Sequence, residues 1–275
     1  MSVVLSLLSS VLWGTSDFAG GLLSRRRPAY AVVGASQAVG LLVATVVALA
    51  TAGFAEPRGW VPWSVLAGVA GALGLVSYYA ALAEGTMGVV SPIAALGAIV
   101  PVVVGVLSGE QPAAVVLVGV VVALAGVVAA SGPELSGGTG ARPVLLAALA
   151  GVAFGATLTF LAVGADHSPV MTLWGMRTTT VLGFGCAALA TRSVGGLEQR
   201  DLGPLLLIGV SDVGANLLYA LATQLGLVSV TAVLASLYPV VTVLLAWWLL
   251  HERLLRIQQV GVVAALAGVV LVSWG

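Results

Sequence analysis

Long apolar segments, separated by short connections that hold most of the charges, run through the whole chain. Only 7% of the 275 residues are charged, whereas 60% are hydrophobic. A soluble domain carries about 25% charged residues, so a chain this poor in charge cannot cover its surface with groups that bind water. Crossing the hydrocarbon core of a bilayer takes about 20 apolar residues in a helix. The sequence therefore predicts an all-α integral membrane protein whose surroundings are the lipid bilayer.

Charged residues and Pro/Gly clusters divide the chain into ten segments of that length. We expect ten transmembrane helices, covering residues 3–24, 28–52, 62–83, 86–107, 112–131, 143–164, 168–191, 202–225, 227–250 and 256–274. The longest connection lies near the middle of the chain and is rich in Gly and Ser, which is typical of a flexible linker. We therefore expect a first domain at 1–132, a linker at 133–142 and a second domain at 143–275.

The two halves resemble each other in sequence. Trp13-Gly14 is followed 141 residues later by Phe154-Gly155, and other matches keep the same order. These are Gly68 with Gly209, Tyr78 with Tyr219, Pro101 with Pro239, and Leu124-Ala125-Gly126-Val127-Val128 with Leu266-Ala267-Gly268-Val269-Val270. An odd number of spans in each half would place the second half upside down in the membrane. The pattern predicts two inverted five-helix repeats, the architecture of many secondary transporters.

With these repeats in view, the chain resembles the drug/metabolite transporter superfamily, specifically its EamA-type ten-helix members. The resemblance covers essentially the whole chain. It rests on Leu12-Trp13-Gly14-Thr15-Ser16-Asp17-Phe18, on Leu237-Tyr238-Pro239-Val240-Val241, and on His251-Glu252-Arg253-Leu254, where His251 departs from the usual Gly. The resemblance implies export or exchange of a small metabolite through a central cavity, in a multi-pass protein of a bacterial inner membrane.

Three charged residues lie well inside predicted spans: Asp17, Arg177 and Asp212. Each costs about 2.5–3.5 kcal/mol at a helix centre on insertion scales, so these side chains should face the bundle interior or a wet cavity. In the eighth predicted span Asn216 and Tyr219 follow Asp212 at spacings of four and three, which places all three on one helix face. We interpret that face as the wall of a cavity. The alternative is that its polar groups only join helices by hydrogen bonds.

Arg177 and Asp212 are expected to be partners. Counted from the loop between their spans, Arg177 is 14 residues in and Asp212 is 10, so their depths differ by about 6 Å at 1.5 Å per residue. The pair is either a permanent internal salt bridge or one for which a substrate or a proton competes. An Arg in a cavity also suits a substrate carboxylate or phosphate.

Asp17 and Asp212 are the candidate proton-coupling residues, because a carboxylate away from bulk water suits proton exchange. Asp17 would instead pair with the Arg25-Arg26-Arg27 cluster if its helix ended early. The expected substrate-binding and cavity residues add aromatic and small polar side chains to the charged ones, although packing or interfacial roles remain alternatives. The full set is Trp13, Asp17, Tyr78, Trp174, Arg177, Asp212, Asn216, Tyr219 and Ser236.

Several classes of function find no support in the sequence. A net charge of zero argues against a nucleic-acid partner. Cys186 is the only cysteine, and the two histidines, His167 and His251, stand in different loops, so we expect no disulfide, metal site or cofactor. Neither an ATP-binding motif nor a nucleophile–base motif is present. The sequence thus predicts no catalytic residue and no enzyme.

We expect a secondary transporter that works by alternating access on a small metabolite such as an amino acid or a related zwitterion or anion. It would be an exporter or exchanger and possibly proton-coupled. A passive facilitator or channel is one alternative, and an intramembrane enzyme acting on a lipid-linked substrate is another.

The loops on one side of the membrane hold eight arginines and those on the side of the termini hold one. By the positive-inside rule this count puts both termini outside, whereas family members more often have them inside. The small-xxx-small spacings Gly119/Ala123 and Gly261/Ala265 would pack either within a monomer or in a homodimer.

Overall fold

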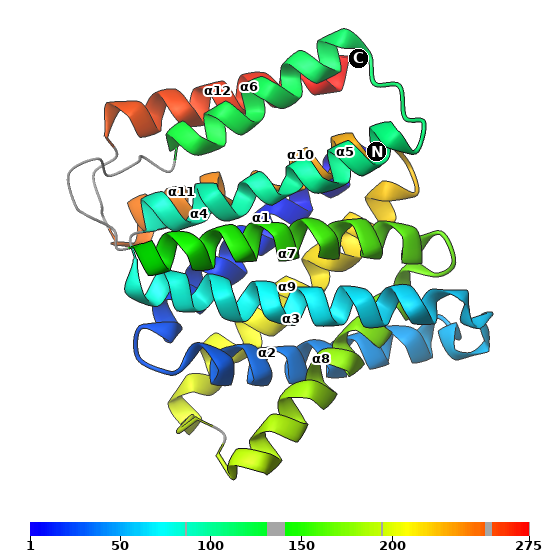
Figure 1. The fold of residues 1–275 in the computed structure, drawn as a ribbon, viewed down its shortest axis with the longest axis vertical. Helices are drawn as coiled ribbons and strands as arrows, with labels where there is room; N and C mark the ends of the chain where they lie inside the picture. The colour runs from blue at the N-terminus through cyan, green and yellow to red at the C-terminus, as the bar shows by residue number, and fades with distance from the viewer. Residues whose placement is uncertain (86, 131–140, 194, 251–254, 275) are drawn as a thin grey trace.

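A computed structural model describes residues 1–85, 87–130, 141–193, 195–250 and 255–274. Helices joined by short connections account for this part of the chain, and it contains no strand. Figure 1 shows the long helices packed side by side in one bundle, with both termini toward the same end. The α-helices are α1 Ser2–Ser24, α2 Ala29–Ala50, α3 Val61–Glu84, α4 Met87–Ala95, α5 Ile99–Leu107, α6 Ala114–Ala130, α7 Ala141–Ala165, α8 Pro169–Thr191, α9 Leu202–Thr223, α10 Val228–Ala235, α11 Tyr238–Leu250 and α12 Arg256–Trp274. Short 3-10 helices lie at Gly53–Ala55, Arg58–Trp60, Leu96–Ala98 (η3) and Gln199–Asp201.

The fourth and ninth predicted spans are each broken into two helices. In the first half, the 3-10 turn η3 connects α4 to α5. In the second half, two residues lie between the end of α10 and the start of α11. Pro101 stands in the first turn of α5 and Pro239 in the first turn of α11. Proline is tolerated there because the first backbone N–H groups of a helix have no partner within it.

Six helical segments are long and apolar enough to cross a membrane, judged over the described residues by length and composition. Shorter apolar helices occupy Ile93–Leu107, Ala114–Ala129 and Arg256–Val272. Helix α8 has 23 residues, but it carries Arg177 and several threonines and falls outside both groups. A multi-pass membrane protein follows from these helices, whereas a count of ten spans does not follow from them alone.

Helices of each half pack on helices of the other half, and these contacts come in matched pairs. Helices α1, α2 and α3 of the first half correspond to α7, α8 and α9 of the second. The contact of α3 with α7 matches that of α9 with α1, and the contact of α3 with α8 matches that of α9 with α2. Two helix pairs, α2 with α8 and α6 with α12, join equivalent helices of the two halves. The pair of α6 and α12 is visible at one end of the bundle in Figure 1. This arrangement is the packing that two related repeats produce around a pseudo-two-fold axis.

Residues that match between the halves occupy equivalent places in the packing. A Cβ added to Gly14 would lie 2.7 Å from the Tyr238 carbonyl oxygen, and one added to Gly155 would lie 2.3 Å from that of Gly97, so the backbones nearly touch. The aromatic pairs are matched as well. Tyr78 packs edge-on against Phe154 with ring centroids 5.6 Å apart, and Tyr219 packs against Trp13 in a tilted arrangement at 6.0 Å. The sequence repeat is therefore a repeat of tertiary contacts.

An ion cluster joins the two halves outside the helices. Arg27, in the α1–α2 connection, donates from Nη1 to the Gly196 carbonyl oxygen at 2.7 Å. Its Nη2 lies 2.6 Å from a Glu198 carboxylate oxygen, and its Nε lies 2.9 Å from one of Asp201. The Glu198 N–H donates to Asp201 at 2.9 Å, which shapes the α8–α9 connection to receive the guanidinium. Arg27 thus fastens the α1–α2 connection of the first half to the α8–α9 connection of the second.

We expect the stabilisation from this cluster to depend on pH. The Arg27 guanidinium holds the pKa of Glu198 below its usual range. A carboxyl group whose pKa is lowered by folding stabilises the folded state above its unfolded pKa, and that stabilisation is lost as pH falls through the folded value. Thermal unfolding in detergent should therefore give a lower Tm for Arg27→Gln than for the wild type at neutral pH. The difference should shrink as Glu198 is protonated at acidic pH, while the control Arg26→Gln should follow the wild type. A Tm difference between Arg27→Gln and the wild type that does not change with pH would rule out pH-dependent stabilisation by the Arg27–Glu198 ion pair.

Candidate functional site

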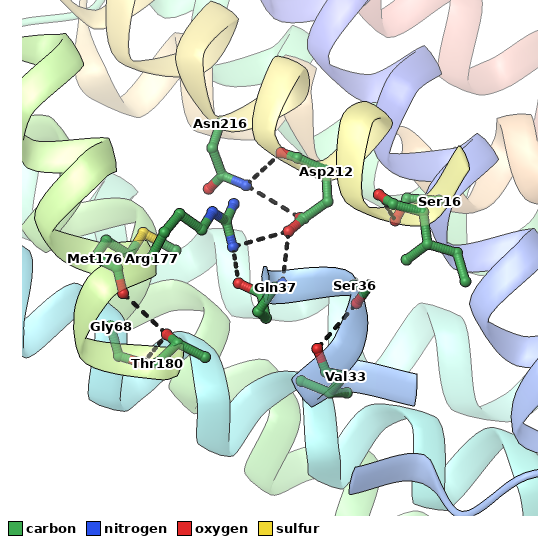
Figure 2. Close-up of polar contacts among 11 residues, drawn as sticks. Ser16, Val33, Ser36, Gln37, Gly68, Met176, Arg177, Thr180, Asp212 and Asn216 are labelled. Carbon is green, nitrogen blue, oxygen red and sulfur yellow. Dashed lines mark hydrogen bonds and ion pairs between the residues drawn. The ribbon is translucent and has the colours of Figure 1, made fainter. Parts of the chain in front are cut away.

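Three helices bring their polar groups together in the middle of the bundle. Arg177 on α8 lies with Nη1 2.9 Å from Asp212 Oδ2 on α9, so the two form the ion pair predicted from their depths. Gln37 on α2 joins both: its Nε2 donates to Asp212 Oδ2 at 2.9 Å, and its Oε1 accepts a hydrogen bond from Arg177 Nη1. Figure 2 shows this closed ring of three side chains. Arg177 and Gln37 are each only 1% exposed.

The Asp212 carboxylate has partners on both oxygens. Oδ2 receives the two donors above, and Oδ1 accepts from Asn216 Nδ2 at 3.1 Å. Asn216 also donates to the Asp212 backbone oxygen at 2.7 Å, one helical turn earlier. Charge-assisted hydrogen bonds of this kind compensate a buried carboxylate for its lost water. Protonating Asp212 would require breaking some of these bonds.

Arg177, by contrast, is only partly satisfied. Its Nε and Nη2 are buried and have no hydrogen-bond partner within the described residues. In Figure 2 these two nitrogens point away from Gln37, toward the side on which Asn216 lies. An unpartnered buried donor costs about 1–3 kcal/mol, and more for a charged group. Nε and Nη2 form one straight edge of the guanidinium, the edge that receives both oxygens of a carboxylate.

A cavity of ≈ 620 Å³, counted with its opening, lies against this network. Its polar wall is formed mainly by Asp17, Arg177, Asp212 and Asn216, and the rest is mostly apolar or aromatic. Helices of both halves contribute. The lining residues are Trp13, Asp17, Gly71, Leu75, Ala94, Ala95, Ala98, Phe154, Thr157, Leu158, Met176, Arg177, Asp212, Asn216, Ser236 and Tyr238. Within the described residues no group of His, Cys, Asp and Glu is arranged to hold a metal ion.

Most of the residues predicted for the cavity reach it. Trp13, Asp17, Arg177, Asp212, Asn216 and Ser236 line it. Ser236 stands at the end of α10, where its hydroxyl donates to the Val233 carbonyl oxygen at 2.8 Å. The structure thus brings together six predicted side chains that are up to 223 positions apart in the sequence.

Three predicted residues do not line the cavity. Tyr78 and Tyr219 are fully buried behind the wall, where their rings pack on the lining residues Phe154 and Trp13. Their hydroxyls are already used: Tyr78 pairs with Ser91 at 2.8 Å, and Tyr219 donates to the Leu158 carbonyl oxygen at 3.2 Å.

Trp174 lies nearer the α2–α3 connection. Its Nε1 donates to Thr45 Oγ1 at 3.1 Å, and its ring packs edge-on against Phe54 and Trp60. Trp174 stands one helical turn before Arg177 on α8 and does not line the cavity. The aromatic cluster of Phe54, Trp60 and Trp174 fixes its ring elsewhere.

Asp17 is the unpaired carboxylate of the site. It is 6% exposed and lines the cavity, and no hydrogen bond or ion pair to it occurs within the described residues. Helix α1 continues to Ser24, and Arg27 is bound to the α8–α9 connection, so Asp17 does not pair with the arginine cluster.

Gln37 is the main residue that sequence reasoning missed. It is uncharged, so it did not stand out as Asp17, Arg177 and Asp212 did. The repeat itself held a signal: at the offset of 141 residues the counterpart of Arg177 is Ser36, the neighbour of Gln37. Because α2 and α8 are equivalent helices that pack on each other, residues near equivalent positions meet where the two helices cross.

An all-helical membrane chain whose two halves pack in matched pairs of helices, around a cavity that holds a buried ion pair, has the organisation of a repeat-built membrane transporter. A model of the EamA-like transporter family matches residues 1–132 and again residues 141–274. The chain therefore belongs to the EamA-like transporter family, as the sequence resemblance implied.

Solved structures support the fold. Among them 26 chains match, including a crystal structure described only as that of a protein, with a TM-score of 0.81 at 18% sequence identity. The alignment covers 99% of this chain and 96% of the other. At this identity the similarity concerns the fold alone. No curated protein matches the chain.

Proposed function

We propose that this protein is a secondary transporter that moves a small metabolite by alternating access. Family membership and the matched packing of the two halves support the proposal, since related halves can tilt about a site that lies between them. In this proposal the chain crosses the membrane ten times as two inverted repeats, residues 1–132 and 143–275, joined by the linker 133–142. The membrane is a bacterial inner membrane, and the direction is export or exchange.

The observation that carries the proposal is the incomplete ion network at the cavity. Within the described residues, Arg177 keeps two buried donors without partners and Asp17 keeps a buried carboxylate without a partner, and both residues line the same cavity. A substrate with an anionic group would satisfy Arg177. A substrate that is also cationic would satisfy Asp17. We therefore propose an amino acid or a related zwitterion or anion as substrate, and the apolar remainder of the wall would face its side group.

Asp17 is the better candidate for coupling transport to a proton. A proton on Asp212 displaces bonds to Arg177, Gln37 or Asn216, whereas a proton on Asp17 displaces no bond within the described residues. We expect Asp17→Asn to keep the protein folded, to weaken uptake of a zwitterionic substrate, and to abolish the stimulation of the remaining uptake by a pH gradient. Asp212→Asn should instead impair uptake at every pH.

These outcomes can be measured with purified protein in proteoliposomes. A thermal-shift screen of amino acids, sugars and nucleotides first selects a radiolabelled substrate, and uptake is then followed with and without an imposed pH gradient. Uptake by the wild type that never exceeds equilibrium and ignores the gradient would identify a passive facilitator. A pH response that survives in Asp17→Asn would remove Asp17 from the coupling mechanism. Conversion of a lipid-linked compound without any flux would favour the intramembrane enzyme.

A further inference from the structure

We infer that Gln37 is a positioning residue that fixes which edge of Arg177 the substrate meets. The inference rests on the proposed function and deepens it, because it assigns the selection for a carboxylate to a residue other than the charged ones. The structural basis is that the Gln37 amide bridges the ion pair, donating to Asp212 and accepting from Arg177. Within the described residues, no other amide side chain is hydrogen-bonded to both ions.

The bridge determines how the guanidinium is turned. Both of the bonds that Arg177 makes, to Asp212 Oδ2 and to Gln37 Oε1, use the single nitrogen Nη1. An arginine that meets a carboxylate without such a constraint commonly forms two parallel bonds to it. Here Gln37 Nε2 shares Asp212 Oδ2 with Arg177, and Asn216 occupies Oδ1. Asp212 therefore offers Arg177 one acceptor instead of two, and the Nε and Nη2 edge stays free.

The free edge is oriented for a ligand. Nε and Nη2 are buried without partners, and Arg177 and Asn216 both line the cavity. A carboxylate that enters the cavity can accept both N–H groups side-on, which would restore the bonds that burial removed. Gln37 itself lies behind this arrangement and does not line the cavity, so its effect passes through Arg177. The role is therefore positioning and not direct contact.

Replacing Gln37 should allow Asp212 to occupy the Nε and Nη2 edge of Arg177. In Gln37→Met the side chain keeps its length and loses both polar atoms. Arg177 then loses one partner and Asp212 Oδ2 loses a competing donor. The guanidinium is expected to rotate and form two bonds with Asp212, which consumes the edge intended for the substrate. In Gln37→Glu the site gains a negative charge beside Asp212, and a carboxylate should be rejected electrostatically.

The test uses three probes that share one carbon skeleton and differ in their charged groups. L-leucine carries an ammonium and a carboxylate, L-leucinamide only the ammonium, and 4-methylpentanoate only the carboxylate. Thermal shifts of the purified full chain in detergent are measured for each probe. We expect wild-type binding to require the carboxylate, and at least a tenfold weaker apparent affinity for L-leucine in Gln37→Met. Gln37→Glu should lose L-leucine binding and retain or gain L-leucinamide binding. The control is Gln224→Met, which removes a Gln–Asp hydrogen bond of 3.0 Å to Asp166 at the exposed end of α9.

A structure of the Gln37→Met variant completes the test and needs no ligand. Two Arg177–Asp212 bonds, with Nε or Nη2 engaged, would support the inference. An unchanged guanidinium, or wild-type affinity for L-leucine in Gln37→Met, would overturn it. If the wild type ignores all three probes, the proposed substrate class fails, and the variant structure alone decides the role of Gln37.

Discussion

Arg177→Met is expected to abolish transport and to destabilise the protein severely. The substitution leaves the Asp212 carboxylate, whose side chain is 8% exposed, without its cation in the middle of the bundle. Removing one partner of a buried ion pair typically costs about 3–5 kcal/mol, because the remaining charge is uncompensated. Thermal unfolding in detergent should show a large drop in Tm, and proteoliposomes that contain the surviving folded protein should take up no substrate.

A second variant separates the structural role of the pair from its role in transport. Arg177→Met combined with Asp212→Asn removes both charges, while an amide at position 212 can still bond to Asn216 and Gln37. Replacing a buried ion pair by neutral groups is often close to neutral for stability. We therefore expect the double variant to recover most of the lost Tm and none of the transport. If it transports like the wild type, the pair only stabilises the fold and the proposed substrate site is wrong.

The sequence predicted the ion pair because depth in a membrane can be counted along a helix. Arg177 and Asp212 flank one short connection, so their relative depth follows from the rise per residue alone. The long-range partners were not accessible in this way. Gln37 meets Arg177 from a helix 140 positions earlier, and only the packing of α2 on α8 brings them together.

Helix faces were predicted more reliably than exact neighbours. The spacing of Asp212, Asn216 and Tyr219 placed them on one face, and all three are buried. Which of them reaches the cavity depends on whether a side chain from another helix stands in front. Trp13 of α1 covers Tyr219, so Asn216 lines the cavity and Tyr219 does not. Periodicity within one helix does not tell which side chains of other helices stand between that helix and the cavity.

The close approach of Gly97 to the backbone of α7 supports a further prediction. A Cβ added to Gly97 would lie 2.0 Å from the Gly151 carbonyl oxygen, which belongs to backbone and cannot rotate away. Gly97→Ala should therefore force η3 away from α7 at the cavity wall formed by Ala94, Ala95 and Ala98. Overpacking of this kind costs about 1–3 kcal/mol or more. We expect a lower Tm and a smaller monodisperse fraction in size-exclusion chromatography.

A control glycine and a second closely packed glycine make this prediction specific. Gly183 on α8 has nothing within 4 Å of an added Cβ, so Gly183→Ala should keep the wild-type Tm or raise it, because Ala favours the helix. A Cβ added to Gly14 would lie 2.5 Å from Val241 Cβ and 2.7 Å from the Tyr238 carbonyl oxygen. This clash is less severe than the 2.0 Å approach at Gly97, so Gly14→Ala should lower the Tm less than Gly97→Ala does. Equal melting of the Gly97 and Gly183 variants would mean that the close backbone approach at η3 does not determine the shape of the cavity wall.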